Sequence, residues 1–176
     1  MVVSVSIDGE HRFSKAPVDR IHVREGIGVD GDAHAGATVQ HRSRVKRDPS
    51  QPNLRQVHLI HAELLDEVNE LVHDVRPGTL GENVLTRGLD LLGLPRDTRL
   101  RIGDAVLRVT GLRNPCQQID DARPGLLRLV VGRASDGTIV RRCGVMTVVE
   151  RSGDISPGDA IVVDLPTGEQ VPLEPV

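Results

Sequence analysis

The sequence predicts a mainly β fold: an antiparallel β-barrel with a few peripheral helices, built as one domain over residues 1–176. First, apolar and polar residues alternate in about eight short, valine-rich stretches, as they do in half-buried strands. Second, Gly-Asp pairs, which favour turns, separate several of these stretches, whereas only two stretches have helical spacing. Third, 25 Val and 19 Leu stand beside one Phe, no Trp and no Tyr, so an aliphatic core is expected. Many short strands and few helices favour a barrel over a βαβ sheet.

The expected strands follow from the alternation. Residues 2–7 (VVSVSI) form the first, and residues 98–113 are expected to form a hairpin that turns at Gly103-Asp104, because both residue types favour turns. Further strands are predicted at residues 54–60, 144–150 and 160–164. The last two are expected to pair as a second hairpin, joined through glycine turns at 152–154 and 157–159.

Two stretches are predicted to be helical. Residues 61–72 place apolar side chains on one face before Pro77-Gly78 ends the element: Leu64, Leu65, Val68, Leu71 and Val72. Residues 124–132 suit either a short helix or a strand, since a short apolar run fits both. Residues 41–53 are polar, strongly basic and contain two prolines, so a mobile loop is expected there. The proline-containing residues 165–176 are expected to trail along the surface.

Composition excludes several classes of protein. The net charge is −3 and aromatic residues are almost absent, which argues against nucleic acid as a partner. No apolar run approaches about 18 residues and no basic segment precedes an apolar one at the N-terminus, so neither a membrane span nor a signal peptide is expected. Two cysteines do not form a disulfide framework. A cytoplasmic location is therefore expected, and an oligomer is compatible with the sequence.

The two cysteines differ in their surroundings. Cys116 closes the run Arg113-Asn114-Pro115-Cys116. A guanidinium favours the reactive thiolate, and a proline stiffens the segment that carries the thiol. The alternative is a small buried residue, which is common for a free cysteine. Cys143 stands directly before an apolar strand and is expected to be structural.

Two glycine-rich segments are further candidates. GVDGDAHAG at residues 28–36 carries Asp32 and His34, and GTLGEN at residues 78–83 presents Glu82 and Asn83. Such loops let backbone N–H groups approach an anion, although turn formation alone explains most of the pattern.

Histidines and arginines supply weaker candidates. His58 and His61 have zinc-like spacing, but no second cluster completes a tetrahedral site, so zinc is not expected. A metal-dependent hydrolase using His34, Asp32 and His58 is a minor alternative. The arginines at 42, 44 and 47 suit an anion-binding patch or a solvated loop.

Five segments, in this order and with these spacings, resemble the MOSC domain, named for the C-terminal domain of molybdenum cofactor sulfurase. The similarity covers about residues 20–164 and rests on GVDGDAHAG (28–36), LRQVHLI with the following acidic helix (54–67), PGTLGENVLTRGLDL (77–91), TRLRIGDAVLRVTGLRNPC (98–116) and RCGVMTVVERSGDISPGD (142–159). The resemblance implies a β-barrel related to that of pyruvate kinase.

The resemblance also implies a site. Cys116 matches the family cysteine that carries sulfur as a persulfide or coordinates molybdenum in the bound molybdenum cofactor. Leu80–Asn83 matches an element near the pterin site, with Leu80 where phenylalanine is usual. The implied cofactor-binding residues are Asn83, Arg113, Arg55, His34, Asp32, Gly81 and Glu82. Asn83 suits the pterin edge, and Arg55 or Arg113 suits the phosphate.

Two roles remain open under this resemblance: sulfur transfer to the cofactor, and molybdenum-dependent reduction of N-hydroxylated compounds. The 176 residues contain no pyridoxal-phosphate desulfurase domain, so pyridoxal phosphate is not expected in this chain. A separate cysteine desulfurase or electron-donor protein is then the expected partner. The alternative is a non-catalytic β-barrel module that binds a small anion or another protein.

Overall fold

The computed structural model describes residues 1–71 and 74–176, apart from the side chains of Arg42 and Ser43. The strands are β1 (Val2–Ile7), β2 (Ala16–Val18), β3 (Ile21–Arg24), β4 (Gly28–Val29), β5 (Val57–His61), β6 (Val84–Thr86), β7 (Arg99–Ile102), β8 (Ala105–Leu112), β9 (Val131–Arg133), β10 (Ile139–Arg141), β11 (Val145–Arg151), β12 (Gly153–Ile155) and β13 (Ile161–Asp164). The helices are α1 (Arg42–Arg47), α2 (Ala62–Leu71), α3 (Gln118–Ala122) and α4 (Leu127–Val130). Among the described residues, no helix is both long and apolar enough to cross a bilayer.

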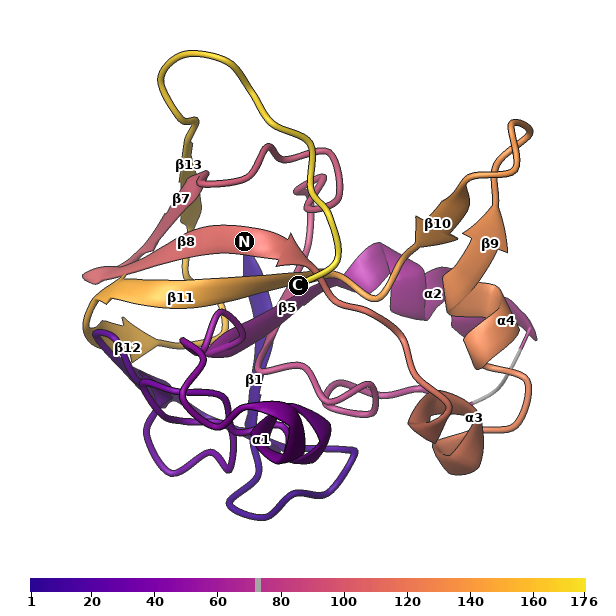
Figure 1. Cartoon of the computed structure of the whole chain (residues 1–176), viewed down its shortest axis with the longest axis horizontal. Coiled ribbons are helices and arrows are strands. Elements are labelled where there is room, and N and C mark those ends of the chain that lie inside the picture. Colours follow the sequence, from indigo (N-terminus) through magenta and orange to yellow (C-terminus); the bar gives the residue numbers. More distant parts are fainter. Residues whose placement is uncertain (72–73) are drawn as a thin grey trace.

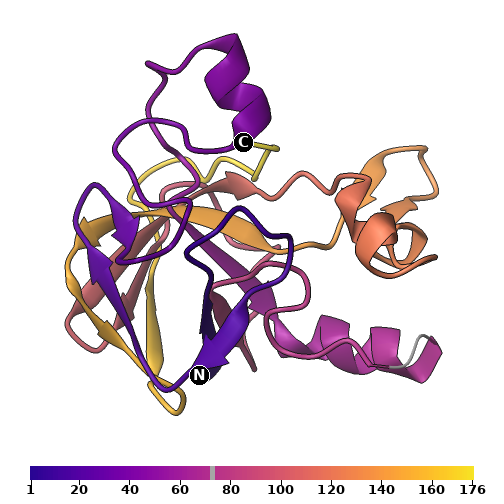
Figure 2. The same ribbon diagram turned by 90° about the horizontal axis from the view of Figure 1, so that it is seen from below.

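An eight-stranded sheet in the order β13-β7-β8-β11-β5-β6-β1-β2 forms the body of the molecule and curls strongly (Figures 1 and 2). Its neighbouring strands are antiparallel except β5 and β6, which are parallel. The mainly β class with few helices is confirmed. The expected antiparallel barrel is confirmed only in part: β5 and β6 pair in parallel, and the pairing of the described strands ends at β13 and β2 without closing. Two backbone hydrogen bonds, which join Val2 to Gly158 and Asp159, only link β1 to the turn before β13.

The predicted hairpin at 98–113 is confirmed as β7 and β8, with Ile102 opposite Ala105. The second predicted hairpin is wrong. β11 pairs with β8 and β5, whereas β13 pairs with β7, on the far side of β8. Between them, β12 joins β3 in a separate three-stranded sheet. The glycine turns therefore redirect the chain between sheets, and long-range packing decides which strands meet.

Helix α2 confirms the helix expected over 61–72, although Val72 lies outside the described residues. Leu64, Leu65 and Val68 are buried and Leu71 is exposed. The ambiguous stretch 124–132 divides into α4 and the first residues of β9, so both readings hold in part. The expected loop at 41–53 contains α1, whose six residues include four basic ones. Its mobility stays a prediction.

The chain's last residues run beside β8. The Leu112 N–H donates to the Glu174 carbonyl at 2.8 Å, and the Val176 N–H donates to the Leu112 carbonyl at 3.2 Å. Leu173 packs against the main core. The expectation of a surface tail is therefore incomplete, because the end of this segment is held by backbone hydrogen bonds.

Two aliphatic clusters hold the fold together. The larger fills the inside of the curled sheet and includes Val5, Leu59 and Leu107. The smaller lies between the sheet and α2, α3 and α4, and includes Leu64, Ile119 and Val130. In Figure 2 these helices project to one side of the sheet, while α1 projects from another. The aliphatic core predicted from composition is confirmed, and it is divided between the inside of the sheet and the layer beneath α2, α3 and α4.

Candidate functional site

A cavity of about 330 Å³ lies where several loops meet at one end of the sheet. This volume is in the range of small-molecule sites in proteins, about 300–1,000 Å³. Its wall includes four arginines, four histidines and one lysine and, among the described residues, no carboxylate: His11, Arg12, Phe13, Lys15, His34, His41, Arg44, Arg55, His58, Gly81, Asn83, Arg113, Asn114, Cys116, Gln118 and Met146. Most of the predicted site residues are brought together here. Asp32 and Glu82 are the exceptions, because both are buried and lie outside this lining.

Three guanidinium groups dominate the charge of the cavity. Arg55 enters from the start of β5, Arg113 from the end of β8 and Arg44 from α1. None of the three forms an ion pair with a carboxylate in the described part of the chain. Burial, followed by the charges of Arg44 and Arg113, lowers the pKa of Arg55 to about 10. The site therefore concentrates positive charge that the protein itself leaves uncompensated.

Arg113 is the clearest example of an uncompensated positive charge in the cavity. Its residue is 8% exposed, its guanidinium carbon lies 5.8 Å from the centre of the Phe13 ring, and its buried Nη1 has no hydrogen-bond partner. A buried unsatisfied donor on a charged group costs free energy. An anion in the cavity could satisfy it. Phe13, which is the chain's single residue of the Phe, Trp and Tyr types, also forms part of the cavity wall.

Cys116 lies on the wall in the connection between β8 and α3. Its thiol is half-buried and donates to Gln118 Oε1 at 3.4 Å. Cys143 is fully buried in the smaller core, and burial raises the pKa of its thiol to about 11 even though Arg113 lowers it. The two cysteines therefore differ in access: Cys116 lines the cavity, whereas the Cys143 thiol is held protonated in the interior, as expected for a structural residue. The chemical role of Cys116 stays a prediction.

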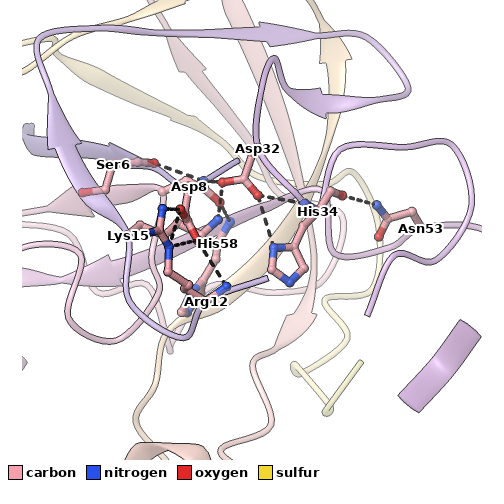
Figure 3. Close-up of polar contacts among 9 residues, drawn as sticks. Ser6, Asp8, Arg12, Lys15, Asp32, His34, Asn53 and His58 are labelled. Atoms are coloured by element: carbon pink, nitrogen blue, oxygen red, sulfur yellow. Dashed lines mark hydrogen bonds and ion pairs between the residues drawn. The ribbon is translucent and has the colours of Figure 1, made fainter. Parts of the chain in front are cut away.

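Behind the cavity, Asp32 organises a buried polar network, drawn in Figure 3. Its Oδ2 lies 2.5 Å from Lys15 Nζ and accepts from Asn83 Nδ2 at 2.9 Å. Its Oδ1 accepts the His34 backbone N–H at 2.9 Å and lies 3.2 Å from His34 Nδ1. Burial alone would raise the pKa of Asp32, but the hydrogen bond from His34 and the charge of Lys15 hold it well below its usual range. Asp32 thus stays charged and orients His34 at the cavity wall.

Asn83 is part of the same network. Its Nδ2 donates to Ser6 O at 3.2 Å as well as to Asp32, and its Oδ1 accepts the His58 N–H at 3.2 Å. His58 Nε2 donates in turn to the Cys143 carbonyl at 2.7 Å, and burial, then the charge of Arg113, lowers the pKa of His58. The Asn83 amide already has partners on both of its polar atoms, so a contact with a pterin edge stays a prediction.

Glu82 has a structural place beside this network. Gly78 N–H donates to its Oε1, its Oε2 has no partner, and the residue is 1% exposed. Burial raises the pKa of Glu82 to about 7. The turn it holds requires glycine at 78 and 81, because both have positive φ and a Cβ would overlap the Lys15 and Phe13 carbonyls.

Over the described residues, no three His, Cys, Asp or Glu side chains come together as a metal-binding group. The histidine and aspartate proposed for a hydrolase have other partners: Asp32 contacts Lys15 and Asn83, and His58 contacts a backbone carbonyl. Sequence reasoning missed His11, Phe13, Lys15 and His41 as parts of the site. The run of basic residues around position 44 was the one signal for His41, and no sequence signal pointed to the other three.

The chain is similar to known proteins in both sequence and structure. Residues 17–162 match the family model of the MOSC domain. The YuaD protein of Bacillus subtilis is 26% identical with a TM-score of 0.74, and the alignment covers 93% of this chain and 96% of that one. Two proteins named YiiM have a TM-score of 0.62. That from Geobacillus stearothermophilus is 17% identical over 93% of this chain and 74% of its own, and that from Escherichia coli is 18% identical over 97% and 72%.

At 17% and 18% identity, the YiiM proteins show a shared fold alone. No curated protein matches the sequence significantly. The family model spans most of the chain and includes every residue that the sequence placed at the site, from Asp32 to Cys116. This chain belongs to the MOSC domain family.

Proposed function

We propose that the cavity binds the molybdenum cofactor, with Cys116 as its molybdenum ligand or as a carrier of persulfide sulfur. The observation that carries the proposal is the placing of an accessible thiol among Arg44, Arg55 and Arg113, three cations that no carboxylate neutralises in the described structure. A ligand that combines a phosphate with a soft metal–sulfur centre matches this combination of groups.

The residues present fit such a ligand in three respects. The unsatisfied Nη1 of Arg113 and the neighbouring Arg55 can hold phosphate oxygens, because guanidinium groups bind phosphate through paired N–H donors. Phe13 and Met146 supply an apolar wall. His34 directs its Nδ1–H at Asp32, so its second ring nitrogen, Nε2, can accept a hydrogen bond from an N–H group of the ligand. When bound, the cofactor supplies a redox-active molybdenum centre.

Cys116 would serve both candidate roles through its thiolate, which is the form that ligates metals and accepts sulfur. In sulfur transfer, a separate cysteine desulfurase would deliver sulfur to Cys116. In reduction of N-hydroxylated compounds, a separate electron-donor protein would act instead. Either role requires a reducing compartment such as the cytoplasm, where Cys116 remains free.

Two measurements test the proposal. The protein is purified from a host that makes the molybdenum cofactor, and bound molybdenum is measured by elemental mass spectrometry. It is also incubated with a cysteine desulfurase and cysteine, and the mass of the peptide containing Cys116 is measured. Wild-type protein is expected to retain molybdenum or to gain one sulfur atom on Cys116. Cys116→Ser is expected to lose the signal, and Cys143→Ala, which removes the buried thiol, is the matched cysteine control.

Each outcome has a distinct meaning. Molybdenum that depends on Cys116 supports a metal ligand, and persulfide without retained molybdenum supports a sulfur carrier. If wild-type protein shows neither, the proposal is wrong. Binding of a small anion that survives in Cys116→Ser would then favour the alternative, a binding module without chemistry at the thiol.

A further inference from the structure

His41 brings a titratable group to the most positively charged part of the cavity. It directly precedes α1, is half-buried and lines the cavity together with Arg44 of the same segment. Burial, followed by the charges of Arg55, His34, Arg44 and Arg113, lowers the pKa of His41 to about 4. At neutral pH the ring is therefore uncharged.

The groups around His41 come from every segment that forms this part of the wall. Arg44 belongs to α1, Arg55 precedes β5, Arg113 follows β8, and His34 lies in the connection after β4. From the β1–β2 connection, Arg12 and Lys15 also line the cavity, but each has a carboxylate partner, Asp8 and Asp32 respectively. Among the described side chains that line this wall, the uncompensated charge near His41 is thus that of the three arginines.

An anion placed among these arginines would offset most of the local positive charge. Opposite charge within a few ångströms favours the protonated form of a histidine, whereas like charges disfavour it. The ring would then gain a proton as the anion binds, and the protonated ring could donate a hydrogen bond to it. By linkage, an anion that promotes protonation binds more tightly when protons are more abundant.

We propose that anion binding in this cavity is coupled to proton uptake at His41, which with Arg44 completes an oxyanion subsite formed by Arg55 and Arg113. The ligand class is a doubly charged tetrahedral oxyanion, either free or as the terminal phosphate of a larger molecule. This inference rests on the proposed function in one respect: the cavity must hold an anion.

The other histidines of the cavity are less suited to this role. His34 Nδ1 already faces the Asp32 carboxylate, so it has an anionic partner before any ligand arrives. His58 lines the cavity but is buried, and its Nε2 already donates to the Cys143 carbonyl. His11 packs edge-on against His34, with ring centres 5.2 Å apart. His41 shares the cavity wall with Arg44, Arg55 and Arg113, and the charges of all three disfavour its protonated form.

The test uses sulfate, whose own charge is constant across the relevant pH range. Sulfate is titrated into the protein by calorimetry at constant ionic strength, in two buffers with different heats of ionisation, from about pH 7.5 to about pH 5.5. Proton uptake on binding is expected, with affinity rising towards low pH by at most about tenfold per pH unit, the limit for one proton.

Three variants assign the proton. His41→Gln is expected to keep sulfate binding through the arginines but to lose proton uptake and the pH dependence of affinity. His22→Gln is the matched control, since His22 is an exposed ring paired with Asp154, away from the cavity. It is expected to behave as wild type. Arg55→Gln is expected to weaken sulfate binding at every pH.

The proposal is overturned if sulfate does not bind, if it binds without proton uptake, or if uptake persists in His41→Gln. Persistence in His41→Gln with loss in His34→Gln would assign the proton to His34. The proposed function fails separately: proton-coupled sulfate binding in a protein that acquires neither molybdenum nor persulfide would leave the subsite established and the cofactor proposal wrong.

Discussion

Glu82 is a buried acid whose charge changes near neutral pH. Burial raises its pKa from 4.5 to about 7, although backbone N–H groups and Lys15 oppose the shift. The folded state therefore binds more protons than the unfolded state between these values. Stability from this group is complete below about pH 4.5 and is lost as the pH rises through about 7, by about 3.4 kcal/mol at most.

We predict that Glu82→Gln removes this loss, because glutamine keeps an acceptor for the Gly78 N–H without a charge. Urea unfolding at about pH 5 and about pH 8 should show wild type losing stability relative to the variant at the higher pH. Glu169→Gln, at an exposed position of the C-terminal segment, is the control and should parallel wild type. A constant difference between wild type and Glu82→Gln would show that Glu82 stays charged in the folded protein.

For single residues, the sequence predicted which side chains belong to the site better than it predicted where each of them lies. Cys116, Arg55 and Arg113 could be predicted to lie together, because each belongs to a segment that matches the family pattern, and all three line the cavity. Their chemical roles stay predictions. Asp32 and Glu82 could be singled out, but not their location behind the wall, since a carboxylate in a glycine loop looks the same exposed or buried. His41 could not be predicted, because its surroundings combine Arg44 of its own segment with Arg55 and Arg113 from two distant ones.

Among the elements, local pattern predicted strands well and pairing poorly. β1, β7, β8, β11 and β13 follow from alternation and turn residues. The partner of β13 depends instead on which edge the curled sheet leaves available, and that edge is β7. α1 was hidden because its basic residues show no apolar stripe, and isolated helices of six residues gain little from local propensity.

The junction between β5 and β11 depends on one glycine. Gly144 has φ of 77°, and a Cβ there would overlap the Leu59 carbonyl of β5. Gly137, in the turn between β9 and β10, has φ of 85° with open space around it. The two positions therefore share backbone strain and differ in steric contact.

We predict that Gly137→Ala costs about 1–2 kcal/mol, the penalty of a left-handed conformation with a side chain. Gly144→Ala should cost clearly more, because the Leu59 carbonyl must move and β5 leads into the site through Arg55 and His58. Chemical denaturation of both variants measures the difference. Equal losses of stability in the two variants would mean that β5 moves away from residue 144 at no additional cost.

At the scale of the whole molecule, the site depends on how the curled sheet and its two cores are joined. β8 lies between β7 and β11 and ends at Leu112, immediately before the segment of Arg113 and Cys116. Gly111 allows the C-terminal residues to approach, since a Cβ there would overlap the Glu174 carbonyl and Val176. The two backbone hydrogen bonds of Leu112 and the packing of Leu173 thus connect the end of the chain to the base of the cavity.

We therefore expect removal of residues 172–176 to affect both stability and the site. Loss of two backbone hydrogen bonds, each about 1 kcal/mol, and of a partly buried leucine, about 1 kcal/mol, should lower the unfolding free energy by about 3 kcal/mol. Because Leu112 leads directly to Cys116, the thiol should also react faster with a maleimide in the folded protein. Leu173→Ala, which keeps the backbone bonds, should show the smaller stability loss and an unchanged labelling rate. If both variants label Cys116 at the wild-type rate, the C-terminal segment stabilises β8 without positioning the cavity wall.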